Sequence, residues 1–103
     1  MTEDETADAM KQATERSVAL VTAMQGDNDG VLDSQLFEAV QWVGIAPYTP
    51  EARRLALQLN QSAHLTTLCI ELLAKASGTT VEQTTQRLAA RLAGYNEPPE
   101  APR

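Results

Sequence analysis

The chain has 103 residues, of which 43% are hydrophobic and 21% charged, and its formal net charge is −6. This length fits one domain and no second core, the ordinary hydrophobic content excludes a wholly disordered chain, and the negative charge argues against nucleic acid as a partner. The single cysteine excludes an internal disulfide, and no apolar run approaches the ~20 residues of a membrane-spanning helix, so we expect a soluble, cytoplasmic protein with no membrane contact.

The N-terminal part of the chain predicts two helices. The first begins at a capping box of Thr2 with Glu5 and ends at Gly26, and the second covers residues 30–43 and ends at Gly44. Apolar residues recur along both segments at intervals of three and four, which is helical spacing. The predicted core faces are Met10, Ala13, Ser17, Leu20, Val21 and Met24, then Leu32, Leu36, Ala39, Val40 and Val43.

The third predicted helix is the longest. Thr49 caps it, Pro50 takes its first position, and it runs to about Ser77, roughly 40 Å at ~1.5 Å per residue. Leucine and other apolar residues spread over more than half of its circumference, so we expect neighbours on several sides and a central place in the fold. One narrow stripe is predicted to face water: Arg53, Asn60, His64, Thr67, Glu71 and Lys75.

The fourth predicted helix follows Gly78, with Thr79 as its cap and Glu82 three residues later, and ends at Gly94. The sequence therefore predicts an all-α, small four-helix bundle-like domain over residues 1–94, with a long central third helix. Residues 95–103 contain three prolines and are predicted to be a flexible tail. The predicted core stripe of the fourth helix is Val81, Thr85, Leu88, Ala89 and Leu92.

The segment QGDNDGVLD, residues 25–33, resembles a calcium loop. With Gly30 in the sixth position, however, the first position is Gln25 and the twelfth is Leu36, neither of which is an anionic ligand. A start at Asp27 instead puts Leu32 where the sharp turn needs glycine. We therefore expect no metal site, and aspartates that cap the following helix.

Catalytic chemistry has no recognisable motif. His64, the only histidine, lacks metal-ligand spacing, no serine or cysteine has a nucleophile setting, and there is no glycine-rich phosphate loop. The sequence predicts a protein that is not an enzyme, with no cofactor and no small-molecule substrate.

The segment LAKASGTTVEQTTQRL resembles a helix-turn-helix DNA reader. Ala74, Gly78 and Thr80 match that family, but Thr84 and Arg87 stand where it carries apolar residues. The apolar residues fall one place later, which would rotate the recognition face. The alternatives are a glycine-capped corner between packed helices, or a DNA-binding regulator over residues 70–92 that uses Gln83, Gln86 and Arg87.

The layout of residues 18–93 is also similar to that of small all-helical proteins of actinobacteria and their phages. The shared features are a GD corner after the first helix, a long leucine-rich third helix, a Gly-Thr-x-x-Glu start and QRLA. The resemblance implies an all-helical fold and such a source, and it implies no activity.

Trp42 lies outside the predicted apolar face of its helix. Either the loop from Gly44 to Tyr48 covers the indole, or the indole belongs to a contact surface, since tryptophan is frequent at interaction hot spots. We expect a non-enzymatic protein interaction or adaptor module whose partner is another protein or a second copy in a homodimer. The predicted partner-binding residues are Trp42, Val31, Ile45 and Tyr48.

Overall fold

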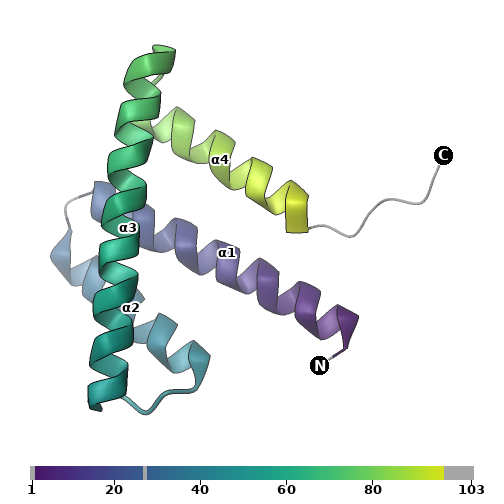
Figure 1. Ribbon diagram of the computed structural model, residues 1–103, viewed down its shortest axis with the longest axis vertical. Helices are drawn as coiled ribbons and strands as arrows, with labels where there is room; N and C mark the ends of the chain where they lie inside the picture. Colours follow the sequence, from purple (N-terminus) through teal and green to yellow (C-terminus); the bar gives the residue numbers. More distant parts are fainter. Residues whose placement is uncertain (1, 27, 97–103) are drawn as a thin grey trace.

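The computed structural model describes residues 2–26 and 28–96, and side chains as far as residue 94. Within these ranges the chain is all helical, without a strand, and forms a small four-helix domain whose third helix is the longest, as predicted (Figure 1). The four helices are α1 (Glu3–Gln25), α2 (Asp29–Val43), α3 (Pro50–Ser77) and α4 (Val81–Asn96).

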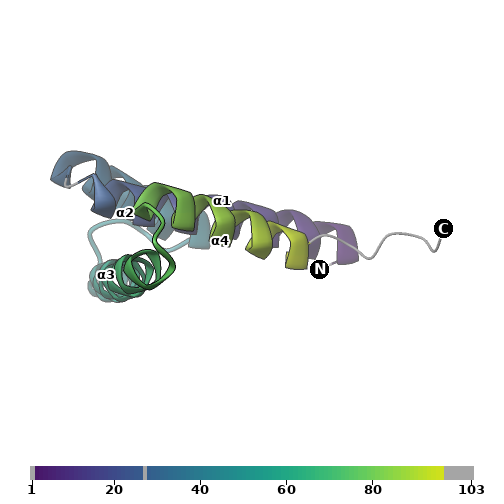
Figure 2. The same ribbon diagram turned by 90° about the horizontal axis from the view of Figure 1, so that it is seen from above.

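The helices form two layers (Figures 1 and 2). α1 lies between α2 and α4 in one layer, and α3 alone forms the other and contacts all three. The Gln25 side-chain amide donates to the Thr85 hydroxyl at 2.8 Å and so ties the end of α1 to α4. The result is a slab with extents of 49 × 40 × 16 Å, in which α3 has neighbours on one side only.

The helix ends follow local capping chemistry at most of the predicted positions. The Thr2 hydroxyl accepts from the Glu5 amide and the Thr49 hydroxyl from the Ala52 amide, each at 3.1 Å, so orphan N–H groups at both N-termini are satisfied. Gly44, at φ 91°, has the left-handed backbone that glycine adopts without strain. Gly78, at φ 68°, ends α3 in the same way.

Both predicted ends of α4 were wrong. The cap is Thr80 rather than Thr79: its hydroxyl accepts from the Gln83 amide, and its own amide donates to the Gln83 side chain, each at 3.1 Å. Thr79 does not cap α4: its amide donates to the Ala74 carbonyl at 3.0 Å, and its hydroxyl bonds to the Thr84 hydroxyl. The C-terminal end differs because Gly94 lacks the positive φ that terminates a helix, and α4 continues to Asn96. Of the predicted tail, residues 97–103 lie outside the described residues.

The core is built around Leu20, Val21, Ala63 and Ile70, where α1 and α3 cross. Of the nine buried hydrophobic residues in the described part of the chain, five are alanines. Small side chains let helix backbones approach closely, and larger residues such as Leu20 and Ile70 fill the space beside them.

The orientation of α3 differs from the prediction. Thr67, expected to face water, is buried and donates its hydroxyl to the Ala63 carbonyl at 2.8 Å. Five of the seven α3 leucines are exposed instead. The reason is that the helix buries its line of small residues, Ala52, Ala63, Thr67 and Ala74, and not the leucine arc.

The buried face of α4 also begins at an unexpected residue. Thr84 has only 4% of its surface exposed. Its hydroxyl bonds to the Thr80 carbonyl at 3.0 Å and to the Thr79 hydroxyl at 2.8 Å. A buried threonine is tolerated when its hydroxyl is satisfied in this way. Leu88 and Leu92, predicted to be core, are exposed.

The α1–α3 crossing yields a test with neighbouring residues. We expect Ala63→Leu to lower the free energy of unfolding by about 1–3 kcal/mol, because the enlarged side chain overpacks the crossing. His64→Ala, one position along on the exposed side, should change it by no more than about 0.5 kcal/mol. Chemical denaturation of both variants measures this, and a reversed order would contradict the observed rotation of α3.

Candidate protein interaction surface

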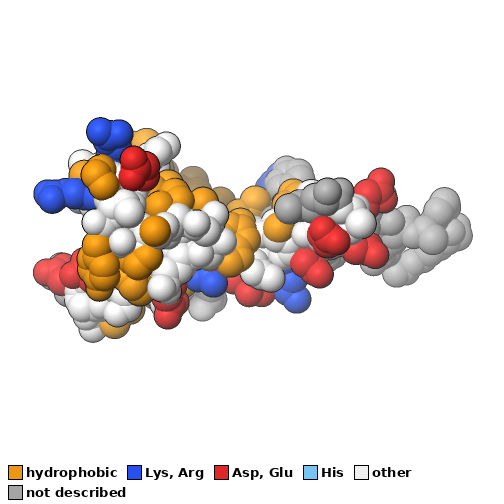
Figure 3. Space-filling view, turned by 90° about the horizontal axis from the view of Figure 1, so that it is seen from below, with side chains coloured by type: hydrophobic (Ala, Val, Ile, Leu, Met, Phe, Trp, Pro, Cys, Tyr) orange, Lys and Arg blue, Asp and Glu red, His pale blue; other side chains and the backbone are white. Residues whose placement is uncertain are grey.

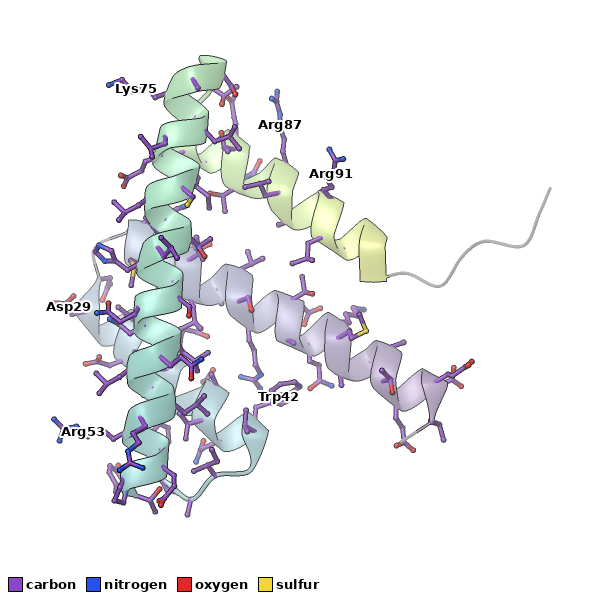
Figure 4. The ribbon with its side chains drawn as sticks, in the orientation of Figure 1. Asp29, Trp42, Arg53, Lys75, Arg87 and Arg91 are labelled. Atoms are coloured by element: carbon purple, nitrogen blue, oxygen red, sulfur yellow. The ribbon has the colours of Figure 1, made fainter. Side chains whose placement is uncertain are left out.

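Trp42 is held by α1. Its indole N–H donates to the Gln12 side-chain oxygen at 2.7 Å, and the Arg16 guanidinium lies over the ring, 5.6 Å from the centroid. Figure 4 shows the side chain projecting from α2 toward α1. With 38% of its surface still exposed, Trp42 both anchors the α1–α2 contact and contributes to the outer surface.

The other three predicted partner residues are distributed along α2 and its following loop. Val31 is exposed at the start of α2, and Ile45 is half-buried directly after the helix. Tyr48 is 93% exposed, and its ring centroid lies 6.0 Å from that of Phe37. The structure therefore does not join Tyr48 to Trp42 in one contact.

Phe37 and Trp42 lie on different sides of α2, since five residues at 100° each turn the helix by about 140°. Phe37 does not belong to the predicted core face, so it was not predicted as a site residue. Its size could have indicated a role, because it is a large aromatic residue directly after core Leu36, on a helix followed by a loop that contains Tyr48.

A hollow of about 680 Å³ opens between α2, the loop and the start of α3. We call it the aromatic hollow; Figure 3 views this end of the molecule and shows hydrophobic side chains gathered there. Asp33 and Arg53 are the two charged residues in its lining. Such an arrangement can accept an apolar side chain and orient polar groups beside it. The residues that define the hollow here are Phe37, Val40, Tyr48, Ala52, Asp33 and Arg53.

The predicted DNA-contact residues form the outer side of α4. Gln86 and Arg87 are exposed, and Arg87 projects to the same side as Arg91, away from α1 (Figure 4). Gln83 is exposed too, but its side-chain oxygen already accepts from the Thr80 amide. Thr84 is buried, as the helix-turn-helix pattern requires at its position, whereas Arg87, at the other apolar position of that pattern, is exposed.

The resemblance to a calcium loop falls partly outside the described residues, because Asp27 is one of those that the structure does not describe. The cap of α2 is Asn28, whose side-chain oxygen accepts from the Val31 amide at 3.1 Å; the prediction that aspartates cap this helix was wrong. Asp29 lies in the first turn, where its charge favours the positive helix end. Among the described residues, no group of three or more His, Cys, Asp or Glu could hold a metal ion.

No family model, curated protein or solved structure matches the chain. Across residues 2–26 and 28–96, every helix is too short or too polar to cross a membrane.

The Trp42–Gln12 contact can be measured by a double-mutant cycle. Trp42→Phe and Gln12→Ala each remove the hydrogen bond, and we expect the two changes to be less than additive in unfolding free energy by about 0.5–1 kcal/mol. Thermal and denaturant unfolding of the four proteins gives this coupling energy. Full additivity would mean that the indole N–H does not bond to α1.

Proposed function

We propose that this chain is a non-enzymatic protein interaction module of the cytoplasm, which binds a protein partner at the aromatic hollow. The observation that carries the proposal is Tyr48, which lines the hollow and is 93% exposed, with its ring centroid 6.0 Å from that of Phe37. Tyrosines in such positions are frequent hot spots, because a rigid ring contributes much contact area with little loss of conformational freedom.

The backbone at Tyr48 supports a functional role. Its φ is 63°, and it is the one non-glycine residue with positive φ in the described part of the chain. This conformation is strained for a bulky side chain and is retained where other interactions compensate, often at binding sites. Stability alone does not require tyrosine here, since glycine adopts the same backbone without strain.

The lining of the hollow indicates the kind of partner. Phe37, Val40 and Ala52 offer an apolar surface, while Asp33 and Arg53 provide one charge of each sign. A protein segment with an apolar anchor and a flanking polar group fits this combination. Trp42 and Val31 lie on another side of α2 and do not line the hollow, so the proposed site keeps Tyr48 and leaves these two residues out.

Tyr48→Gly separates binding from folding. We expect the variant to keep its unfolding free energy within about 1 kcal/mol of the wild type, because relief of the strained backbone offsets the lost ring contact. Its affinity for the partner should fall at least about fivefold, the effect of a hot spot worth 1 kcal/mol or more.

The measurement is affinity capture from lysate of the source cells after nuclease treatment, with partner retention compared between wild type and Tyr48→Gly. Met10→Ser, which changes an exposed apolar residue of α1, is the matched control and should retain the partner. Equal retention by wild type and Tyr48→Gly would contradict the proposed site.

A second candidate function is DNA binding through α4, favoured by Arg87 and Arg91 on one exposed side of that helix. Two features argue against it: the net charge of −6 repels phosphates, and the Gln83 side chain is occupied in the cap of α4.

Mobility shifts with random-sequence duplex test this second candidate. We expect no retained complex at physiological salt, because only a few cations face the duplex against an unfavourable total charge. A complex that persists at that salt and disappears with Arg87→Ala, but not with Lys11→Ala in α1, would establish DNA binding in place of the first proposal.

A further inference from the structure

One side of α3 faces away from the other helices (Figure 2). The buried residues of α3 lie opposite to this side, and exposed leucines occur on it. Leu65 and Leu72 have 64% and 69% of their surface exposed, and Leu68 between them is also exposed. Intervals of three and then four residues place these side chains in one row along the helix. We call this row of three leucines the α3 outer face.

The flat shape of the described residues leaves a broad surface open to a partner. Their extents are 49 × 40 × 16 Å, and the radius of gyration, 15.4 Å, exceeds the ~13 Å expected for a compact chain of this length. An obligate homodimer buries roughly 1,000–2,500 Å² on each subunit, and a broad face of a flat molecule is the part that can supply such an area.

Charge selects the same face for self-association. The sequence from Leu55 to Ile70 contains no Asp, Glu, Lys or Arg, although the chain as a whole has a net charge of −6. Leu65 and Leu68 lie in this uncharged segment. In an antiparallel pair centred on Leu68, Glu71 and Lys75 beside Leu72 face the uncharged segment of the other copy, so like charges do not meet. Contacts through the start of α1 would instead oppose the acidic residues of its first turn, Glu3, Asp4 and Glu5.

We propose that the α3 outer face packs against the same face of a second copy of the chain in a two-fold symmetric homodimer. This inference rests on the proposed interaction function and names a second surface and its occupant. A two-fold axis produces a self-complementary contact, which a continuous row of leucines can provide with either helix orientation. Because the row is centred on Leu68, the axis lies near Leu68 and Cys69.

Cys69 is exposed and is the only cysteine, so the unmodified protein carries a reporter beside the proposed axis. We expect a short bismaleimide to cross-link two copies through Cys69 at micromolar concentration, and sedimentation equilibrium to show a dimer. Leu72→Glu should abolish the cross-link and raise the dimer dissociation constant at least ~100-fold, because each dimer then buries two carboxylates. Met10→Glu, an equivalent change outside α3, should alter neither result.

A chain that sediments as a monomer at every concentration, or a dimer that is unaffected by Leu72→Glu and gives no Cys69 cross-link, would overturn the proposal. The cross-link on the wild-type protein keeps the test decisive if Leu72→Glu does not fold. Tyr48→Gly separates the two proposals: it should leave dimerisation and cross-linking unchanged while it weakens partner capture. If the wild-type chain is a monomer but Tyr48→Gly still weakens partner capture, only the dimer is refuted. If the wild-type chain is a dimer but Tyr48→Gly retains the partner, only the aromatic hollow is refuted.

Discussion

The crossing of α3 over α1 through small side chains is the contact on which the rest of the structure depends. Ala63 and Ile70 of α3 pack against Leu20 and Val21 of α1. Alanine at position 63 lets the two backbones come close there, and the larger Leu20, Val21 and Ile70 pack around it. An α-helix has 3.6 residues per turn, so residues two and five positions after a buried residue lie on the opposite side of the helix. Leu65 and Leu68 are two and five positions after Ala63, and they are therefore turned to the outside.

The exposed leucines are thus a consequence of how the core is built, and they connect stability to association. A slab 16 Å thick exposes much surface for its volume, and burial of apolar surface is the main force that opposes chain entropy. If a second copy covers the α3 outer face, the folded state is stabilised by mass action and its stability depends on protein concentration. The aromatic hollow differs in this respect, because Tyr48 contributes exposed contact area at the expense of a strained backbone.

Features set by nearby residues could be predicted from the sequence, and features set by distant contacts could not. The Thr49–Pro50 start and the Gly78 end of α3 depend on neighbouring residues and were predicted, whereas two adjacent threonines, Thr79 and Thr80, left the cap of α4 ambiguous by one position. A helical wheel shows that α3 is apolar over a wide arc but not which part of the arc other helices cover. The Trp42–Gln12 and Phe37–Tyr48 contacts depend on the path of the chain between helices, and positive φ at a tyrosine has no signal in the sequence.

The two proposed surfaces are compatible in one assembly. Arg53 at the aromatic hollow and Leu68 in the α3 outer face are fifteen residues apart, or about 22 Å along the helix. Ala52 and Ala56, which line the hollow, belong to the buried side of α3, whereas Leu65, Leu68 and Leu72 are exposed on its other side. A pair formed through α3 would therefore leave both hollows open and present two identical binding sites on one rigid particle. When a dimeric partner has bound one hollow, its second copy is held near the other hollow at an effective concentration far above its concentration in solution. A modest affinity at each Tyr48 would then suffice for a stable complex.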